Sequence, residues 1–268
     1  MRYRSMGRTG LRVSEICLGT MTFGSRTEPD EAFRIMDTAF DAGVTFLDTS
    51  DAYPAGSEEI GGSEAIIGRW LAGRARDQVI VATKCFVPTG LMPHQRGNSR
   101  QHILSAVDDS LRRLGTDYID LYQLHGLDPS TPIEETMQAL DDLVRWGKVR
   151  YVGASNFRAW QLGLALGASN KVGITRFVCD QPRYNILWRD IESDLLPLCR
   201  DQGITHAAIS WVLAQEGITS AIVGASRVEQ IEDSLRHAEV QLTREDLEFC
   251  DQAWYQIPRP TDPAVAIR

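Results

Sequence analysis

Three apolar runs decide how this chain folds: VTFLDTSDAY (44–53), VIVATK (79–84) and DYIDLYQLH (117–125). Each run is short, rich in β-branched and aromatic residues, and ends on a polar side chain, which is typical of a buried strand. Helical patterns separate the runs, so we expect a parallel sheet covered by helices. The sequence therefore predicts the α/β class, and strands that carry polar residues at their carboxyl ends favour a (β/α) TIM barrel.

Four chemically useful side chains lie at or just past the ends of these strands: Asp48, Tyr53, Lys84 and His125. The carboxyl ends of barrel strands open on one face, which is where (β/α) barrels carry their chemistry. Lysine is rarely buried without a partner, so Lys84 is hard to explain as a packing residue. We therefore expect an acid, a phenol, an amine and an imidazole to meet in one pocket.

The rest of the chain repeats the same alternation of strand and helix. Residues 3–14 are predicted to form an N-terminal β-hairpin, and no linker interrupts the chain, which favours a single domain over residues 1–268. Further strands are expected at 16–21, 149–155, 177–185 and 219–226. Together with the three opening runs these account for barrel strands one to six and eight.

The seventh strand has no counterpart in the sequence. Residues 190–202 and 205–215 are both predicted to be helices, and little more than Gly203 and Ile204 separates them. A right-handed crossover needs a strand between two such helices. The seventh strand and its loop are thus expected to be missing near 204–205.

Two explanations for this gap stay open at the level of sequence. In the first, the protein has lost the segment, which leaves a barrel with an open seam and unpaired strand edges. Alternatively, the sequence omits a mobile segment of a longer chain, which predicts a break between Ile204 and Thr205. The cost of losing a whole strand and helix favours the second explanation.

Composition limits the possible functions. The formal net charge of −8 argues against a nucleic-acid partner and against an anionic membrane surface. No apolar stretch reaches the ~20 residues that span a bilayer. The five cysteines are odd in number and contain no CxxC pair, which favours reduced thiols and a cytoplasmic protein. The histidines show no metal-ligand spacing, so no metal site is expected.

Seven motifs, taken jointly and in order, resemble the aldo-keto reductase family, particularly the branch that contains the β subunits of voltage-gated potassium channels and related bacterial oxidoreductases. The motifs are LGTMTFG (18–24), FLDTSDAY (46–53), TK (83–84), SLRRLGTDYIDLYQLH (110–125), GKVRYVGASNF (147–157), QPRYN (181–185) and IVGASRVEQIEDSL (222–235). The resemblance implies a (β/α)8 barrel that reduces an aldehyde or ketone to an alcohol with NADPH. It also implies that Asp48, Tyr53, Lys84 and His125 are the catalytic tetrad.

The chemistry assigns these four residues different roles. Carbonyl reduction needs a hydride at carbon, which the cofactor supplies, and a proton at oxygen. Tyr53 is the expected general acid, but a free phenol has a pKa of about 10. Lys84, held by Asp48, is expected to lower that pKa, and His125 is expected to polarise the carbonyl.

The resemblance also implies the positions that hold the cofactor. Near the nicotinamide ring it places Thr20, Met21, Asp48, Ser155, Asn156 and Gln181. Around the adenosine half it places Gly224, Ser226, Arg227, Gln230 and Asp233. A strand feeding a helix N-terminus there suits a phosphate, and the Arg227 guanidinium suits a 2′-phosphate, which favours NADPH over NADH.

A second function is left open: a nucleotide-binding regulatory module of the same fold with weak or no turnover. The complete tetrad favours the enzyme, whereas a real loss of the seventh strand favours the module. The sequence determines neither the physiological substrate nor the oligomeric state.

Overall fold

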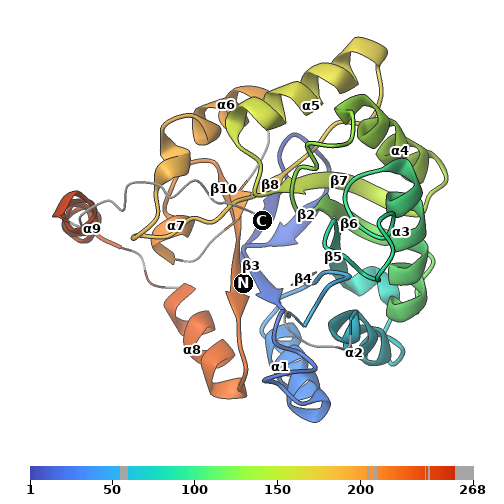
Figure 1. Ribbon diagram of the computed structural model, residues 1–268. Coiled ribbons are helices and arrows are strands. Elements are labelled where there is room, and N and C mark those ends of the chain that lie inside the picture. The colour runs from blue at the N-terminus through green and yellow to red at the C-terminus, as the bar shows by residue number, and fades with distance from the viewer. Residues whose placement is uncertain (55–59, 204–205, 208–209, 239, 241, 257–268) are drawn as a thin grey trace.

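Eight parallel strands form a curled sheet in the computed structural model of this chain, and helices surround it (Figure 1). The structure describes residues 1–54, 60–203, 206–207, 210–238, 240 and 242–256. The sheet runs in the order β8-β7-β6-β5-β4-β3-β10-β9. Its strands are β3 (Ile16–Gly19), β4 (Phe46–Asp48), β5 (Ile80–Cys85), β6 (Ile119–Leu124), β7 (Val149–Ser155), β8 (Asp180–Gln181), β9 (His206–Ala207) and β10 (Ile218–Gly224). This is the predicted α/β barrel architecture.

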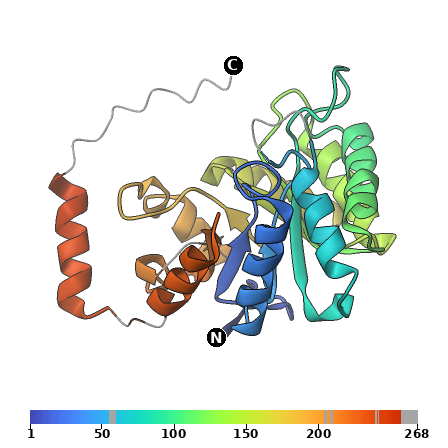
Figure 2. The ribbon, with the colours of Figure 1, turned by 90° about the horizontal axis from the view of Figure 1, so that it is seen from below.

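Nine α-helices lie within the described residues, and most of them form a ring outside the sheet (Figure 1). They are α1 (Pro29–Asp41), α2 (Gly62–Leu71), α3 (Arg100–Leu114), α4 (Ile133–Arg145), α5 (Ala159–Val172), α6 (Leu195–Gln202), α7 (Ser210–Leu213), α8 (Val228–Ala238) and α9 (Arg244–Gln256). Two 3₁₀ turns are η1 (Arg76–Gln78) and η2 (Asp190–Glu192). Helix α9 lies outside the ring (Figure 2), where Asp251 pairs with Arg189.

The amphipathic pattern explains how the helices attach. In α1, Ala32, Ile35, Met36 and Ala39 are fully buried, at the 3- and 4-residue spacing of one helical face. Strands β5 and β6, in contrast, are buried along nearly their whole length because the helices cover one face and the barrel interior covers the other. Both patterns follow directly from the sequence.

Side chains from alternate strands fill the barrel interior. Phe46, Leu121 and Cys179, from β4, β6 and the residue before β8, pack there in a cluster separate from the outer core. Gly153 on β7 makes room for them, since a Cβ atom there would lie 2.5 Å from Cys179 Sγ. Such layers, drawn from every second strand, are the packing rule of (β/α)8 barrels.

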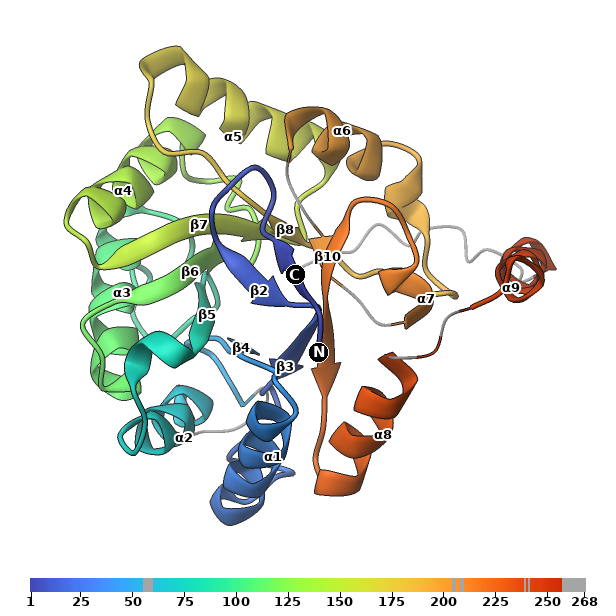
Figure 3. The same cartoon turned by 180° about the vertical axis from the view of Figure 1, so that it is seen from behind.

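The predicted hairpin is present as β1 (Tyr3–Ser5) and β2 (Arg12–Ser14), paired antiparallel. It crosses the amino end of the barrel (Figure 3), and Met6 from its turn enters the interior cluster. The Arg8 amide donates to the Gly203 carbonyl at 3.1 Å, so the hairpin also holds the end of α6. The hairpin therefore closes the barrel at the end opposite the predicted site.

The seventh position corrects the predicted helix over 205–215. His206–Ala207 form the two-residue strand β9, which pairs parallel with β10, and α7 is Ser210–Leu213. The physical reason is that a free β10 edge offers backbone partners that outweigh local helical propensity. Among the described residues no ladder hydrogen bond joins β9 to β8, so the ring is open at this seam. The predicted break between Ile204 and Thr205 falls outside the described residues.

Gly7 gives a test of the hairpin's attachment. Its φ is +58°, and a Cβ atom would lie 2.5 Å from the Gly203 carbonyl oxygen and 2.9 Å from that of Val178. We expect Gly7→Ala to lower the free energy of unfolding by about 2 kcal/mol or more, through strain and overpacking against backbone. Gly10→Ala is the matched control, because a Cβ atom there has nothing within 4 Å. Equal urea midpoints for the two variants would contradict this account of the contact.

Candidate active site

A buried ion pair lies where β4 and β5 end. Lys84 Nζ lies 2.5 Å from Asp48 Oδ2 and donates to the Thr49 carbonyl at 2.8 Å. The Lys84 and Asp48 residues are only 1% and 3% exposed. Parallel pairing of the strands, with Asp48 opposite Ala82, brings the two side chains together. The burial of both charges makes each dependent on the other.

The phenol and the imidazole gather around this pair. Lys84 Nζ lies 5.3 Å from the centroid of the Tyr53 ring, and the Tyr53 and His125 rings meet edge to face at 5.7 Å. His125 follows β6 directly, and its amide donates to the Cys85 carbonyl at 2.9 Å. The structure thus brings all four of the predicted residues, Asp48, Tyr53, Lys84 and His125, into one cluster.

The pKa of Tyr53 is raised, whereas the sequence predicted that Lys84 would lower it. Burial raises the pKa of the Tyr53 phenol, and the nearby Asp48 raises it further, while Lys84 lowers it. The result is a pKa above the usual value, because desolvation outweighs the single ammonium. Tyr53 therefore holds its proton firmly at neutral pH.

His125 is neutral at physiological pH. Burial, assisted by the positive charge of Lys84, lowers its pKa to about 3. Its Nδ1 atom lies 3.2 Å from Ser50 Oγ. A neutral imidazole has one donor and one acceptor nitrogen, so the partner of Nδ1 decides what the other nitrogen offers to a ligand.

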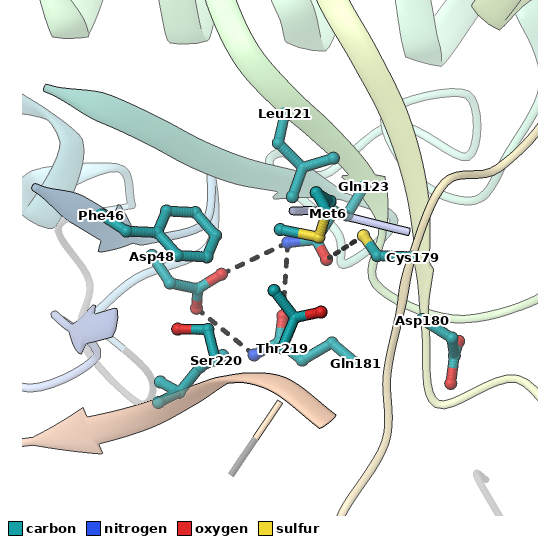
Figure 4. A pocket seen from close by; sticks show the side chains of 11 residues that line it. Met6, Phe46, Asp48, Leu121, Gln123, Cys179, Asp180, Gln181, Thr219 and Ser220 are labelled. Atoms are coloured by element: carbon teal, nitrogen blue, oxygen red, sulfur yellow. Dashed lines mark hydrogen bonds between the residues drawn. The ribbon is translucent and has the colours of Figure 1, made fainter. Parts of the chain in front are cut away.

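Gln123 is a site residue that the sequence argument missed. Its Nε2 donates to Asp48 Oδ1 and to Gln181 Oε1, both at 3.3 Å, and Gln181 Nε2 donates to Asp48 Oδ2 at 3.4 Å (Figure 4). Gln123 lies two residues before His125, on the same side of β6, and that period of two is the signal that could have found it. Asp48 is therefore held by two amides as well as by Lys84.

The positions predicted near the nicotinamide lie at the same end of the barrel. Ser155 Oγ donates to the Gln181 carbonyl at 3.0 Å, and Asn156 Nδ2 donates to the His125 carbonyl at 3.1 Å. Asn156 has a φ of +58° and so bends away from β7. Thr20 is buried and donates to the Asp48 carbonyl at 3.0 Å, whereas Met21 is 52% exposed. These groups surround the tetrad with amide and hydroxyl groups that suit a carboxamide.

The positions predicted around the adenosine half lie where β10 enters α8. Gly224 ends β10, and Ser226 donates to Gln230 Oε1 through its amide at 2.8 Å and through its hydroxyl at 3.0 Å. The members of this group that α8 or its entry exposes to solvent are Arg227, Gln230 and Asp233. Asp233 forms an ion pair with Arg236 at 3.4 Å on the helix surface, and its place near the adenine stays a prediction.

The N-terminus of α8 attracts an anion in this structure. The Val228 amide donates to the Glu31 carboxylate of α1 at 3.0 Å. Free amides and the helix dipole favour negative charge at such a place. The residues present thus fit a phosphate-bearing cofactor, with amides from α8 and a guanidinium from Arg227.

Two further searches cover the described part of the chain. Within it, no group of three or more His, Cys, Asp or Glu side chains could hold a metal ion. None of the helices described there is long and apolar enough to cross a membrane.

Comparison with known proteins agrees with this geometry. A model described as the aldo/keto reductase family matches residues 15–207 and 203–255. The chain belongs to the aldo/keto reductase family. An uncharacterized oxidoreductase of Bacillus subtilis, YrpG, is 35% identical over 308 positions, covering 92% of this chain and 94% of the relative. The family makes the chain an enzyme, an oxidoreductase whose general reaction is carbonyl reduction.

Two fungal relatives carry more specific names. Norsolorinic acid reductase B of Dothistroma septosporum is 38% identical over 221 positions, covering 76% of this chain and 55% of the relative. Versiconal hemiacetal acetate reductase of Aspergillus parasiticus is 35% identical over 230 positions, covering 76% of this chain and 65% of the relative.

The comparisons also locate what this chain lacks. The two segments of the family match overlap at residues 203–207, which include β9. The alignment with the Bacillus subtilis oxidoreductase spans 308 positions, although this chain has 268 residues, so the relative carries at least 40 residues without a counterpart here. The place of the overlap coincides with the shortened seventh strand.

The buried ion pair gives a double-mutant test. Lys84→Met leaves Asp48 charged and buried, so we expect a loss of about 3–5 kcal/mol in the free energy of unfolding. Adding Asp48→Asn removes the stranded charge and should restore part of that loss. Lys148→Met is the control, because Lys148 pairs with Asp108 at the surface and should cost less than about 1 kcal/mol. Additive effects of the two buried substitutions in denaturant unfolding would contradict the coupling.

Proposed function

We propose that this enzyme reduces an aldehyde or ketone to an alcohol with NADPH, with Tyr53 as the general acid. One observation carries the proposal: a protonated, half-buried phenol lies against both a paired ammonium and a neutral imidazole. A carbonyl oxygen placed between Tyr53 and His125 would meet a proton donor on one side and a polarising ring on the other.

Each member of the tetrad has a separate task in this proposal. The bound cofactor supplies the hydride. Tyr53 gives its proton to the carbonyl oxygen, and Lys84 stabilises the phenolate that remains. Asp48 keeps Lys84 charged and fixed, and Gln123 and Gln181 fix Asp48 in turn. His125 orients the carbonyl by a hydrogen bond.

The preference for NADPH is proposed on Arg227. This arginine is exposed beside Ser226 at the entry to α8, where the N-terminus of the helix favours an anion. A guanidinium binds a phosphate by two parallel hydrogen bonds, which a 2′-hydroxyl cannot accept in the same way.

Three broader proposals accompany this function. The substrate is a small carbonyl compound, in keeping with the names of the fungal relatives, which are reductases. The whole of residues 1–268 forms one aldo/keto reductase domain. The compartment is the cytoplasm, a proposal supported by the five free cysteines, four of them buried.

The shortened seventh strand supports a second candidate function. A module that binds the nucleotide and turns over slowly needs the barrel but tolerates a weaker grip on the cofactor. The two-residue β9 and the open seam beside it favour this alternative, while the complete tetrad favours the reductase.

Tyr53→Phe tests the reductase directly. Removing the hydroxyl should lower kcat for a generic aromatic aldehyde by about 10²–10⁴-fold, the usual contribution of a general acid. NADPH binding, followed by fluorescence, should stay nearly unchanged. Tyr118→Phe is the control, because Tyr118 precedes β6 at the other end of the barrel, between Arg76 and Arg150. Normal turnover in Tyr53→Phe would refute the assignment, and NADPH binding without any wild-type turnover would favour the module.

Arg227→Ala tests the cofactor preference. Losing a charged hydrogen-bonding partner of the 2′-phosphate should weaken NADPH binding by about 10- to 100-fold, equivalent to about 1.5–3 kcal/mol. NADH binding should change little, so the ratio of the two dissociation constants is the measurement. Arg236→Ala is the matched control, because Arg236 lies in the last turn of α8, away from the helix start. If the ratio of the two dissociation constants is unchanged in Arg227→Ala, Arg227 does not bind the 2′-phosphate.

A further inference from the structure

A buried hydrogen-bonded chain runs from Asp51 to the imidazole of His125. Ser50 Oγ lies 3.2 Å from Asp51 Oδ1 and also 3.2 Å from His125 Nδ1. The Ala52 amide donates to the same hydroxyl at 3.3 Å. Ser50 and Asp51 are both fully buried. The roles proposed above for the tetrad do not use either residue.

The serine hydroxyl has one proton, so only one of its two neighbours can receive it. If Asp51 is ionised, it accepts the Ser50 proton, and His125 Nδ1 must then donate to the serine oxygen. If Asp51 is protonated, its acid proton goes to Ser50, and the Ser50 proton goes to His125 Nδ1. The first arrangement leaves His125 Nε2 as an acceptor, and the second makes it a donor.

Asp51 lies in surroundings that disfavour its charge. Its Oδ2 atom has no hydrogen-bond partner within the described part of the molecule. Burial, followed by the nearby Glu64 of α2, raises its pKa to about 8, although Ser50 and the Arg113 side chain of α3 lower it. Two further groups face it from the sheet, Cys85 of β5 and Tyr122 of β6, and Tyr53 and His125 lie on its active-site side.

Glu64 does not compete for this role. Its carboxylate accepts from Arg113 Nε at 2.7 Å and from Thr83 Oγ1 at 2.5 Å, so its oxygens are already engaged. Asp51 is the carboxyl group that faces Ser50. The proton of the chain therefore resides on Asp51 at neutral pH.

We propose that Asp51 is a positioning residue that sets, through Ser50, which nitrogen of His125 carries the proton. With Asp51 protonated, His125 presents an Nε2–H that donates to a carbonyl oxygen. With Asp51 ionised, His125 presents a bare Nε2 that accepts from an alcohol. The dependence of the His125 tautomer on Asp51 applies to the protein without cofactor, whereas its effect on reduction and oxidation rests on the proposed function.

The tautomer of His125 is expected to change with pH as Asp51 loses its proton. Below the pKa of about 8 the donor tautomer prevails, and above it the acceptor tautomer prevails. Because the pKa of His125 is about 3, the ring stays neutral across this whole range and only its tautomer changes. The raised pKa of Tyr53 separates that group's titration from the Asp51 step.

The direct test is the ¹⁵N NMR spectrum of the histidine rings in the apoprotein, from about pH 6 to about pH 10, around the Asp51 pKa of about 8. The His125→Asn variant identifies the signals of this ring. The wild type should change from Nε2–H to Nδ1–H as pH rises. Asp51→Asn and Ser50→Ala should each abolish that change, because one removes the titrating proton and the other cuts the chain.

Asp180→Asn is the matched control for the loss of a buried carboxyl. Asp180 is 1% exposed, and burial raises its pKa to about 7, but its carboxyl points away from Asp48, Gln123 and Gln181 (Figure 4). This variant should keep the wild-type tautomer change. A single tautomer throughout in the wild type, or a change that persists in Asp51→Asn, would overturn the inference.

Turnover gives a second readout that separates the two proposals. NADPH-dependent aldehyde reduction should lose rate above a pH of about 8 in the wild type and not in Asp51→Asn. Ser50→Ala should lower kcat about fivefold at neutral pH, the contribution of one neutral hydrogen bond, with the KM for NADPH unchanged. If no aldehyde is reduced, the proposed function fails while the tautomer result stands. Normal reduction without a tautomer change refutes only the role of Asp51.

Discussion

The buried pair of Lys84 and Asp48 is the interaction on which the rest of the site depends. An ammonium at 1% exposure costs several kcal/mol to desolvate, so it persists only where a carboxylate and further acceptors reach it. Asp48 Oδ2 and the Thr49 carbonyl meet that need. This requires β4 and β5 to be neighbours in parallel register, with Asp48 opposite Ala82 and Lys84 two residues further along β5. The sheet order that brings these ends together also brings Tyr53 and His125 to them.

The barrel interior next to the pair provides further hydrogen-bond partners for the buried carboxylate of Asp48. The second carboxylate oxygen of Asp48, Oδ1, accepts a hydrogen bond from Gln123 of β6. Gln181 of β8 donates to Oδ2, the oxygen that Lys84 also contacts. These three residues come from alternate strands, so one polar layer of the barrel spans three of them. Beneath it the layer becomes apolar, with Phe46 and Leu121, and Met6 closes the end. A polar layer in place of an apolar one contributes specificity of geometry more than stability.

The sequence was sufficient to predict where β5 and β6 end, because apolar strand runs that end on a polar residue are local signals, whereas the strand expected at 177–185 is only Asp180–Gln181. The clustering of Asp48, Tyr53, Lys84 and His125 followed from one topological rule about parallel strands. The raised pKa of Tyr53 could not be predicted from the sequence, because burial is a property of the whole fold. Here burial outweighs the charge of Lys84. Strand β9 was missed for a related reason, since two residues show no period at all. Its partner, the β10 edge, exists only after the barrel has formed.

The open seam separates what this chain keeps from what it lacks. In the cyclic order of the strands, β4, β5 and β6 lie opposite the gap between β8 and β9, and they carry all four residues of the tetrad. The groups that hold the proton chemistry therefore do not depend on the missing segment for their geometry. Beyond the seam lie β10 and the entry to α8, where Arg227 and the helix amides offer a place for a phosphate. In the reductase proposed above, the short seventh strand is therefore expected to affect how firmly the cofactor is held, while the acid–base groups remain assembled.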